Sequence, residues 1–323
     1  MSCMYRFFTA ALFSLAALSA PALAQEFPDR PVRLVVPFLA GGTVDSTGRI
    51  LAQKLSEQTG QQFIVENRGG AGGNIGSEAV AKSNPDGYTL LHTAPTLVVN
   101  QFLYNNMPYD ADKDFAPIGL FAVTPVVLMV SNDLPVKNLD ELIAYAKANP
   151  GKVSFGSAGV GTIPHLAGEL FKSLAKVEIV HVPYKGTSAA MNDLVGGHIQ
   201  VLFDLLPSSL PQINSGRVRA IANAGTKRPA VLADLPTLAE QGLKGYDAAS
   251  WVAVVAPVKT PAPILKKLRT EMGAALKSPD IVKRLSDLGS MPGTADEADF
   301  RKFLKTETNK WAEVIKASGA KQK

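Results

Sequence analysis

The chain has 323 residues, of which 33 are Lys or Arg and 28 are Asp or Glu, for a formal net charge of +5. The basic residues are scattered rather than gathered in a stripe, which argues against a nucleic-acid-binding protein. The single cysteine, Cys3, excludes an intrachain disulfide and a zinc–thiolate site. A length of about 300 residues favours either two lobes or one large domain.

The first 24 residues have the pattern of a cleavable signal peptide. One basic residue, Arg6, precedes an apolar run over Phe7–Leu18. The segment closes with Pro21-Ala22-Leu23-Ala24, which predicts cleavage before Gln25. The apolar run is too short for a permanent membrane span, and no lipid-attachment cysteine precedes the cleavage point. We therefore expect an exported, soluble, thiol-free protein.

The stretch Arg33–Arg49 combines a short strand, a glycine pair and a helix. Residues 34–37 are apolar and end in proline, which predicts a buried strand. Gly41 and Gly42 follow, and Thr43 or Asp45 is the expected N-cap of the next helix. A helix start of this kind directs backbone N–H groups at one point and suits a bound anion. A tight turn without any ligand is the equally weighted alternative.

Strands and helices then alternate, which predicts an α/β protein with parallel strands. Residues 115–130 look like one or two strands, broken at Pro117 and at Thr124-Pro125. Two blocks of similar design follow each other, and ligands bind at the carboxyl ends of such strands. We expect further strands over 62–66, 88–92, 153–156, 178–182, 200–204, 219–224 and 251–256. We expect helices over 77–82, 138–148, 163–174, 188–195, 207–215, 263–276, 279–288 and 295–317.

Two enzyme motifs fail on spacing. Gly70-x-Gly72-x-x-x-Gly76 resembles a dinucleotide-binding turn, but Ile75 stands where the third glycine is needed. Ser157 lacks the glycine that a nucleophile elbow requires two residues earlier, where Phe155 stands. Neither a nicotinamide cofactor nor a serine nucleophile is expected.

The four histidines are dispersed along the chain, and no pattern of acids or histidines predicts a metal site. A structural or surface role is expected for His92, His181 and His198. His165 is the exception, because it lies in the first turn of a predicted helix after Gly161-Thr162.

Neutral hydrogen-bond donors mark the ends of several predicted strands. Such loops suit an anion held by hydrogen bonds without covalent chemistry. Asp204 stands at one strand end, where it either orients a ligand or water or caps the following turn. Lys185 either offsets ligand charge or is solvated. The donors are Thr43, Thr93, Thr96, Ser157, Thr162, Tyr184 and Thr187.

Several motifs in order resemble the Bug family, the periplasmic substrate-binding proteins of tripartite tricarboxylate transporters. The resemblance extends over essentially the whole chain after the signal peptide. The matching segments are Pro31–Phe38, Gly41-Gly42-x-x-Asp45, Val65–Gly76, Pro85–Leu90, His165–Glu169, His181–Gly186 and Asp234–Thr237.

The resemblance implies a two-lobed, Venus-flytrap protein of the periplasmic-binding-protein fold with a crossed chain. Lobe I would comprise residues 25–125 and 251–323, and lobe II residues 126–250. The implied ligand is a small carboxylate, such as an organic acid, an amino acid or an aromatic acid. The implied partners are the membrane permease subunits, met transiently. No cofactor, no metal and no nucleic acid is implied, and we expect a monomer in the periplasm.

Position by position, the resemblance assigns the ligand-binding residues. The loop from Phe38 through Gly41, Gly42 and Thr43 to Asp45 would act through water, and Thr93 and Thr96 would line the same lobe. The carboxylate would be met by Ser157, Gly161, Thr162 and His165, and the wall closed by Tyr184, Lys185, Gly186, Thr187 and Asp204.

Two departures from the family pattern affect the ligand rather than the fold. Leu39-Ala40 stands where relatives often have a proline before the glycine pair, and Val44 replaces a hydroxyl residue. An exported hydrolase, with His165 and Asp204 as acid and base in the same cleft, is the alternative from another class.

Overall fold

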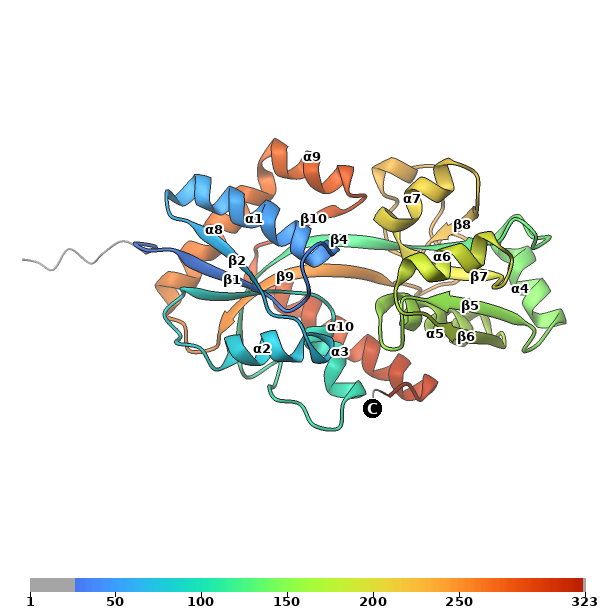
Figure 1. Ribbon diagram of the computed structural model, residues 1–323, viewed down its shortest axis with the longest axis horizontal. Helices are drawn as coiled ribbons and strands as arrows, with labels where there is room; N and C mark the ends of the chain where they lie inside the picture. Colours follow the sequence, from blue (N-terminus) through green and yellow to red (C-terminus); the bar gives the residue numbers. More distant parts are fainter. Residues whose placement is uncertain (1–26, 322–323) are drawn as a thin grey trace, which may run out of the picture.

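The computed structural model describes residues 27–321 of the chain; the predicted signal peptide lies outside the described residues. Figure 1 shows an α/β molecule of two lobes side by side, joined by long strands. This arrangement confirms the predicted fold class. Within the described residues, no helix combines the length and apolar character needed to cross a membrane.

Three parallel strands form the outer part of the sheet in each lobe, β2-β1-β3 in lobe I and β7-β5-β6 in lobe II. In lobe I, Leu34 of the first strand lies opposite Val65 and Leu90 on its two neighbours, and all three side chains are apolar. The strand order through the molecule is β2-β1-β3-β9-β4-β7-β5-β6, with β10 and β8 also paired to β4. The strands are β1 (Val32–Val36), β2 (Phe63–Asn67), β3 (Thr89–Thr93), β4 (Phe115–Val130), β5 (Val153–Ser157), β6 (Ile179–Pro183), β7 (Val201–Leu205), β8 (Arg219–Asn223), β9 (Ala249–Pro257) and β10 (Met291–Thr294).

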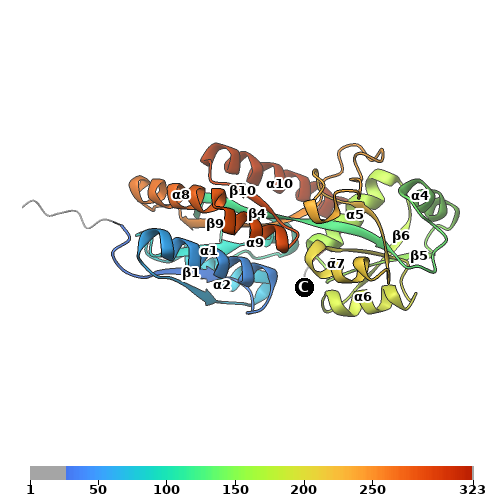
Figure 2. The same cartoon turned by 90° about the horizontal axis from the view of Figure 1, so that it is seen from above.

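The helices cover both faces of these sheets (Figures 1 and 2). Most follow a strand in the chain, as in βαβ units. They are α1 (Thr43–Thr59), α2 (Asn74–Ala81), α3 (Thr96–Leu103), α4 (Leu139–Ala148), α5 (Ile163–Ala175), α6 (Thr187–Val195), α7 (Leu206–Asn214), α8 (Ala262–Lys277), α9 (Pro279–Asp287) and α10 (Glu297–Ser318).

Strand β4 is one 16-residue strand that belongs to both lobes. It pairs with β9 as far as Pro125, and with β7 from Val126 onward. The expected breaks are therefore wrong. Pro117 lies beside a shift in the β4–β9 register, and Pro125 lies where the partner strand changes. A proline, which has no N–H to give, is tolerated at such irregular positions.

The chain returns to lobe I beside the point where it left. The Ala224 N–H donates to the Val126 carbonyl at 2.8 Å, and the Ala248 N–H donates to the Ala224 carbonyl at 2.7 Å. Strand β9 then begins at Ala249. Two adjacent antiparallel strands, β4 and β9, thus carry the chain between the lobes.

Two elements of lobe I have no counterpart among the sequence-based expectations. Helix α3 follows Pro95 directly, and its apolar residues resemble a strand. Strand β10 contains Pro292 and Gly293, which are rare in strands. A Cβ at Gly293 would lie 2.2 Å from the Leu120 carbonyl oxygen, so only glycine permits this close pairing with β4.

Helix α10 contacts α3 of lobe I and α5 of lobe II. It lies on the opposite side of β4 from α1 and α7 (Figure 2). Its buried Glu307 accepts hydrogen bonds from the indole nitrogens of Trp251, at 3.0 Å, and Trp311, at 2.9 Å. Glu307 also pairs with Lys310. This network attaches the helix to the returning strand β9.

Candidate functional site

In Figure 1, α1 of lobe I and α6 of lobe II both begin on the sides of their lobes that face each other. The loops at these positions follow the carboxyl ends of β1 and β6, which belong to parallel sets of strands. Ligands of open α/β sheets bind at such ends. These loops therefore form the candidate site.

The Asp45 carboxylate holds the turn before α1. It accepts from the Gly41 N–H at 2.9 Å, from Asn67 Nδ2 at 2.9 Å and from Arg49 Nε at 3.1 Å. The hydrogen bond from Arg49 keeps the pKa of this buried carboxyl at about 2. The expected capping by Thr43 or Asp45 is wrong. Helix α1 begins after Gly42 with no side-chain cap, because the carboxylate is turned to the preceding loop.

Phe38 and Thr96 meet in lobe I at one glycine. A Cβ at Gly73 would lie 3.4 Å from the Phe38 ring and 3.4 Å from the Thr96 hydroxyl oxygen. The Phe38 carbonyl accepts from Asn67 Nδ2 at 3.1 Å. Asn67 thus joins the turn before α1 to the end of β2. It was not among the expected site residues, although its place at a strand end could have revealed it.

His92 lies beneath the first turns of α1. Its Nε2 is 3.1 Å from the Thr47 hydroxyl, which donates to the Thr43 carbonyl at 2.8 Å. Complete burial lowers the pKa of His92 to about 3, so the ring is neutral. The neighbouring Thr93 is fully buried, and its hydroxyl has no hydrogen-bond partner among the described residues.

In lobe II, a histidine pair supports the loop after β5. The Ser157 hydroxyl lies 2.7 Å from His181 Nε2, and His165 Nδ1 accepts from the Gly161 N–H at 3.1 Å. The two imidazole rings stack with centroids 4.0 Å apart. Although His165 and His181 are dispersed in the sequence, they lie together in the structure. The fold brings the histidines together from α5 and β6, which sequence spacing does not reveal.

Both imidazoles are neutral near pH 7. Burial lowers the pKa of His165 to about 3 and that of His181 to about 4. His165 Nε2 lies 3.8 Å from the Glu169 carboxylate. Because Nδ1 accepts a hydrogen bond, the proton of the neutral ring is on Nε2. His165 thus shapes the loop with an uncharged ring and offers no positive charge to a ligand.

The hydroxyl protons of three predicted ligand residues are used within lobe II. The Thr162 hydroxyl donates to the Gly159 carbonyl at 2.7 Å, and Thr162 caps α5. The Tyr184 hydroxyl donates to Asp193 at 2.6 Å, and burial raises its pKa to about 12. The Thr187 hydroxyl donates to Asp204 at 3.0 Å. Lys185, between them, is exposed.

Asp204 is buried beneath the starts of α6 and α7. Besides the Thr187 hydroxyl, its carboxylate accepts from the hydroxyls of Ser208 at 2.6 Å and Ser209 at 3.2 Å. Burial raises the pKa of this carboxyl. Of the two roles left open by the sequence, these contacts match the one that holds the turn.

The groups in these loops that could bind an anion are the backbone N–H groups at the starts of two helices. Helix α1 begins after Gly42 and α6 begins after Gly186, and neither start has a side-chain cap. The first N–H groups of a helix have no partner inside it and carry partial positive charge. One such start belongs to each lobe.

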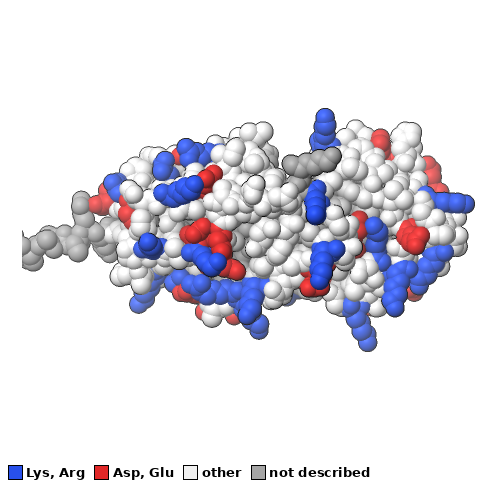
Figure 3. Space-filling model, turned by 90° about the horizontal axis from the view of Figure 1, so that it is seen from below, with Lys and Arg blue, Asp and Glu red and all other residues white. Residues whose placement is uncertain are grey.

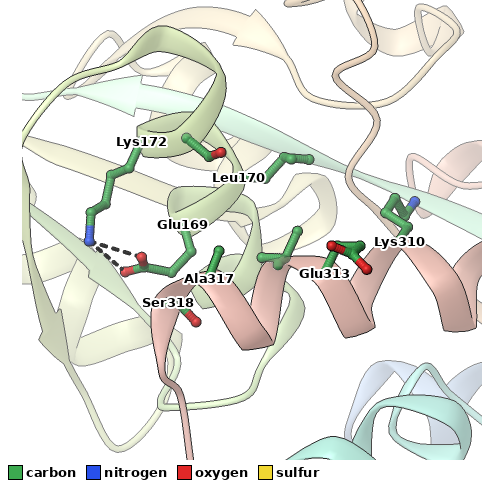
Figure 4. Close-up of a pocket in the computed structure, with 9 residues that line it drawn as sticks. Glu169, Leu170, Lys172, Lys310, Glu313, Ala317 and Ser318 are labelled. Atoms are coloured by element: carbon green, nitrogen blue, oxygen red, sulfur yellow. Dashed lines mark hydrogen bonds and ion pairs between the residues drawn. The ribbon is translucent and has the colours of Figure 1, made fainter.

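A hollow lies between α5 and α10 (Figure 4). In Figure 2, α10 is on the opposite side of β4 from α1 and α7. The volume of the hollow is about 650 Å³. Glu169 and Lys172 of α5, paired at 2.9 Å, face Lys310 and Glu313 of α10 across it. It lies away from the uncapped helix starts. No group of three His, Cys, Asp or Glu in the described part of the chain could hold a metal ion.

Charge is scattered over the face seen in Figure 3, with basic and acidic side chains interspersed. This distribution offers no continuous basic surface on that face.

Two lobes joined by crossed strands, with helix starts facing each other, define a periplasmic-binding-protein fold. The family model described as "Tripartite tricarboxylate transporter family receptor" (TctC) matches residues 47–320. The chain belongs to this family, which includes Bug proteins. It is 42% identical over 290 residues to the UPF0065 protein in the tcbD-tcbE intergenic region of Pseudomonas sp. strain P51, covering 90% of this chain and 86% of that one. It is 37% identical to Protein BugT of Bordetella pertussis, covering 95% of each chain.

Solved structures of related proteins have the same fold. Rpa4515 of R. palustris, solved with adipate, superposes with a TM-score of 0.80 at 39% identity, covering 92% of this chain and 99% of that chain. MatC (Rpa3494) of Rhodopseudomonas palustris, solved with bound malate, has a TM-score of 0.75 at 32% identity, covering 90% and 100%. The chain is therefore a solute-binding receptor by family and by fold.

Proposed function

We propose that the protein captures a small carboxylate between its lobes and presents it to the permease subunits of a tripartite tricarboxylate transporter. The observation that carries the proposal is the pair of uncapped helix starts, α1 in lobe I and α6 in lobe II, at the carboxyl ends of parallel strands. N–H groups from both lobes would engage one bound molecule. Adipate and malate in the related structures support a carboxylate.

We further propose that the lobes close by a hinge in β4 and β9. The division would follow residues 25–125 and 251–323 for lobe I and 126–250 for lobe II. The change of partner strand between Pro125 and Val126, beside the start of β9 at Ala249, supports this placement. Closure requires that the ligand bind the closed state more tightly than the open state. Donors on both lobes would provide that difference.

The protein would act in the periplasm as a monomer, after removal of residues 1–24, without catalysing a reaction. A hydrolase would need a free imidazole at the site. The His165 Nδ1 instead accepts from the Gly161 N–H, and the Asp204 carboxylate is taken up by hydroxyls. These contacts support capture over catalysis. Turnover of a bound acid that His165→Ala abolishes would favour the hydrolase.

The test is thermal unfolding of the purified protein with a panel of mono- and dicarboxylates. A ligand that binds only the native state raises the melting temperature. The matched control is the amide of each acid, which keeps the carbon body and removes the charge. Mass spectrometry of small molecules released from freshly purified, denatured protein would name the natural ligand. If no carboxylate raises the melting temperature above its amide, the proposal is wrong.

A further inference from the structure

We propose that the carboxylates bound by this receptor have an apolar carbon body without hydroxyl groups. The inference rests on the proposed function and names the ligand class of the same site. It follows from an apolar rim, defined as Phe38, Leu39 and Ile75, that lies beside the uncapped start of α1.

The rim is one surface made by two segments of lobe I. Leu39 is 80% exposed and Ile75 is 50% exposed. A Cβ at Gly69 would lie 3.3 Å from Leu39 Cδ2, and a Cβ at Gly70 would lie 2.5 Å from Ile75 Cδ1. Because Gly69 and Gly70 are consecutive, the two exposed side chains flank the same short turn.

Phe38 extends this surface toward α3. Its ring lies against Gly73, where the Thr96 hydroxyl also approaches. The rim thus follows the starts of α1, α2 and α3, next to the Gly41–Gly42 turn. A single exposed leucine needs no explanation, but apolar side chains gathered beside a binding turn mark a recognition surface.

A ligand held at the α1 start by its carboxylate would place its carbon body against the rim. Methylene or aromatic carbons would gain from leaving water there. A hydroxyl group on the body would lose its water without a partner on the rim, since Phe38, Leu39 and Ile75 have no polar side-chain atoms. Sites of this kind reject polar ligands by leaving groups unpaired.

Side chains of lobe II offer few free hydrogen-bonding groups to a hydroxyl on the ligand. The hydroxyl protons of Thr162, Tyr184 and Thr187 are donated to protein oxygens. The Asp204 carboxylate accepts three hydroxyls and is 2% exposed. The predicted hydroxyl donors Thr162, Tyr184 and Thr187 of the wall opposite the rim are therefore already engaged.

Isothermal titration with two matched pairs of six-carbon acids tests the class. The monocarboxylates are hexanoate and gluconate, and the dicarboxylates are adipate and galactarate. Within each pair, chain length and number of carboxylates are equal, and only the hydroxyl groups differ. We expect the acid without hydroxyls to bind at least about tenfold more tightly in each pair, the lower end of the range for differences in apolar contact.

A hydroxylated acid that binds as tightly as its partner in either pair would overturn the class and leave the receptor function standing. If none of the four acids binds, the class is likewise overturned. The carboxylate panel against amides then decides separately whether the receptor function holds.

The variant Leu39→Ser tests the rim directly, because a side chain that is 80% exposed contributes little to folding. We expect the affinity ratio within each pair to shrink about tenfold, and Leu39→Met to restore it. Val258→Ser, at a 47% exposed valine just after β9, is the matched control and should leave the ratio unchanged. An unchanged ratio in Leu39→Ser would show that the rim does not select the ligand.

Discussion

Each lobe has a buried aspartate beneath its binding loops, and the two carboxylates are satisfied by different partners. Asp45 of lobe I accepts only from nitrogen donors, namely Gly41, Asn67 and the charged Arg49. The side chains that donate to Asp204 of lobe II are all hydroxyls, those of Thr187, Ser208 and Ser209. N–H donors cannot accept a hydrogen bond, whereas hydroxyls can.

The two aspartates therefore differ in charge balance. Arg49 neutralises Asp45 and lowers its pKa, whereas no cation is among the hydrogen-bond partners of Asp204, whose pKa burial raises. The lobe I turn depends on an ion pair, and the lobe II turn on a network of neutral groups. The same Asp→Asn substitution should therefore cost more stability in lobe I than in lobe II.

The largest expected effect is the difference in the free energy of unfolding between Asp45→Asn and Asp204→Asn. In Asp45→Asn, the new amide N–H group would face donors only, so we expect the free energy of unfolding to fall by about 2 kcal/mol or more. In Asp204→Asn, the serine hydroxyls can rotate to accept, and the expected loss is below about 1 kcal/mol. Urea denaturation at pH 7 without ligand measures both. Equal losses in the two variants would contradict the comparison.

The pH dependence of stability should have opposite signs at the two sites. The pKa of Asp45 is about 2 in the folded state against an ordinary 3.8, so its ionised form stabilises the fold by about 2 kcal/mol above pH 4. That contribution is lost as the pH falls from about 4 to about 2. Asp204, with its raised pKa, favours the folded state below pH 3.8, and this advantage is lost as the pH rises through the raised pKa.

Urea denaturation of wild type and both variants from pH 2 to pH 7 checks these signs. Relative to wild type, Asp45→Asn should worsen as the pH rises from 2 to 4. Asp204→Asn should improve as the pH rises above 3.8. Parallel curves for the two variants would show that the carboxylates do not differ in this way.

The smallest expected effect concerns the glycines before α1 and α6. Gly42 has φ −84° and no atom within 4 Å of an added Cβ, so serine fits there and can cap α1. We expect Gly42→Ser to raise stability by about a few tenths of a kcal/mol and to weaken carboxylate binding, because the cap occupies an N–H group of the site. Gly186 has φ 114°, where the same change is strained and should lower stability.

Thermal unfolding and calorimetric titration of Gly42→Ser measure the two halves of this prediction. Gly60→Ala, at the other end of α1, is a control for binding: its φ of 71° makes alanine strained, so stability should fall, but the affinity should not change because the binding turn is untouched. A variant that gains stability and keeps full affinity would show that ligand binding does not use the start of α1.

Most helices and strands could be predicted from the sequence, because capping residues and apolar patterns lie within or next to each element. A helix was expected over 138–148; α4 covers Leu139–Ala148, and the Asn138 side chain before it accepts from the Glu141 N–H at 2.9 Å. The 16-residue strand β4 did not follow, because whether proline breaks a strand depends on which neighbour lies at that register. The short strand β10 likewise depends on the close approach of Gly293 to Leu120, a tertiary contact.

The site residues were predicted as a set of side-chain types, and their individual contacts remained open. Thr162 and Thr187 are at the helix starts where spacing put them. Their hydroxyl protons, however, are donated to partners that come from other segments. The pairing of His165 with His181 and the contact of Asn67 with Asp45 each depend on the packing of a helix against a strand. A sequence pattern does not show whether a hydroxyl is hydrogen-bonded to another part of the protein and so no longer free to bind a ligand.

The place of β9 has a consequence for how the chain becomes folded during synthesis. β9 lies between β3 and β4 in the sheet, yet it is synthesised about 120 residues after β4. A chain delivered from its N-terminus can complete lobe II while the sheet of lobe I is still in two separate pieces. Until β9 arrives, the inner edge of β3 is unpaired and open to other chains. The lobe that is translated first is therefore the one that finishes folding last.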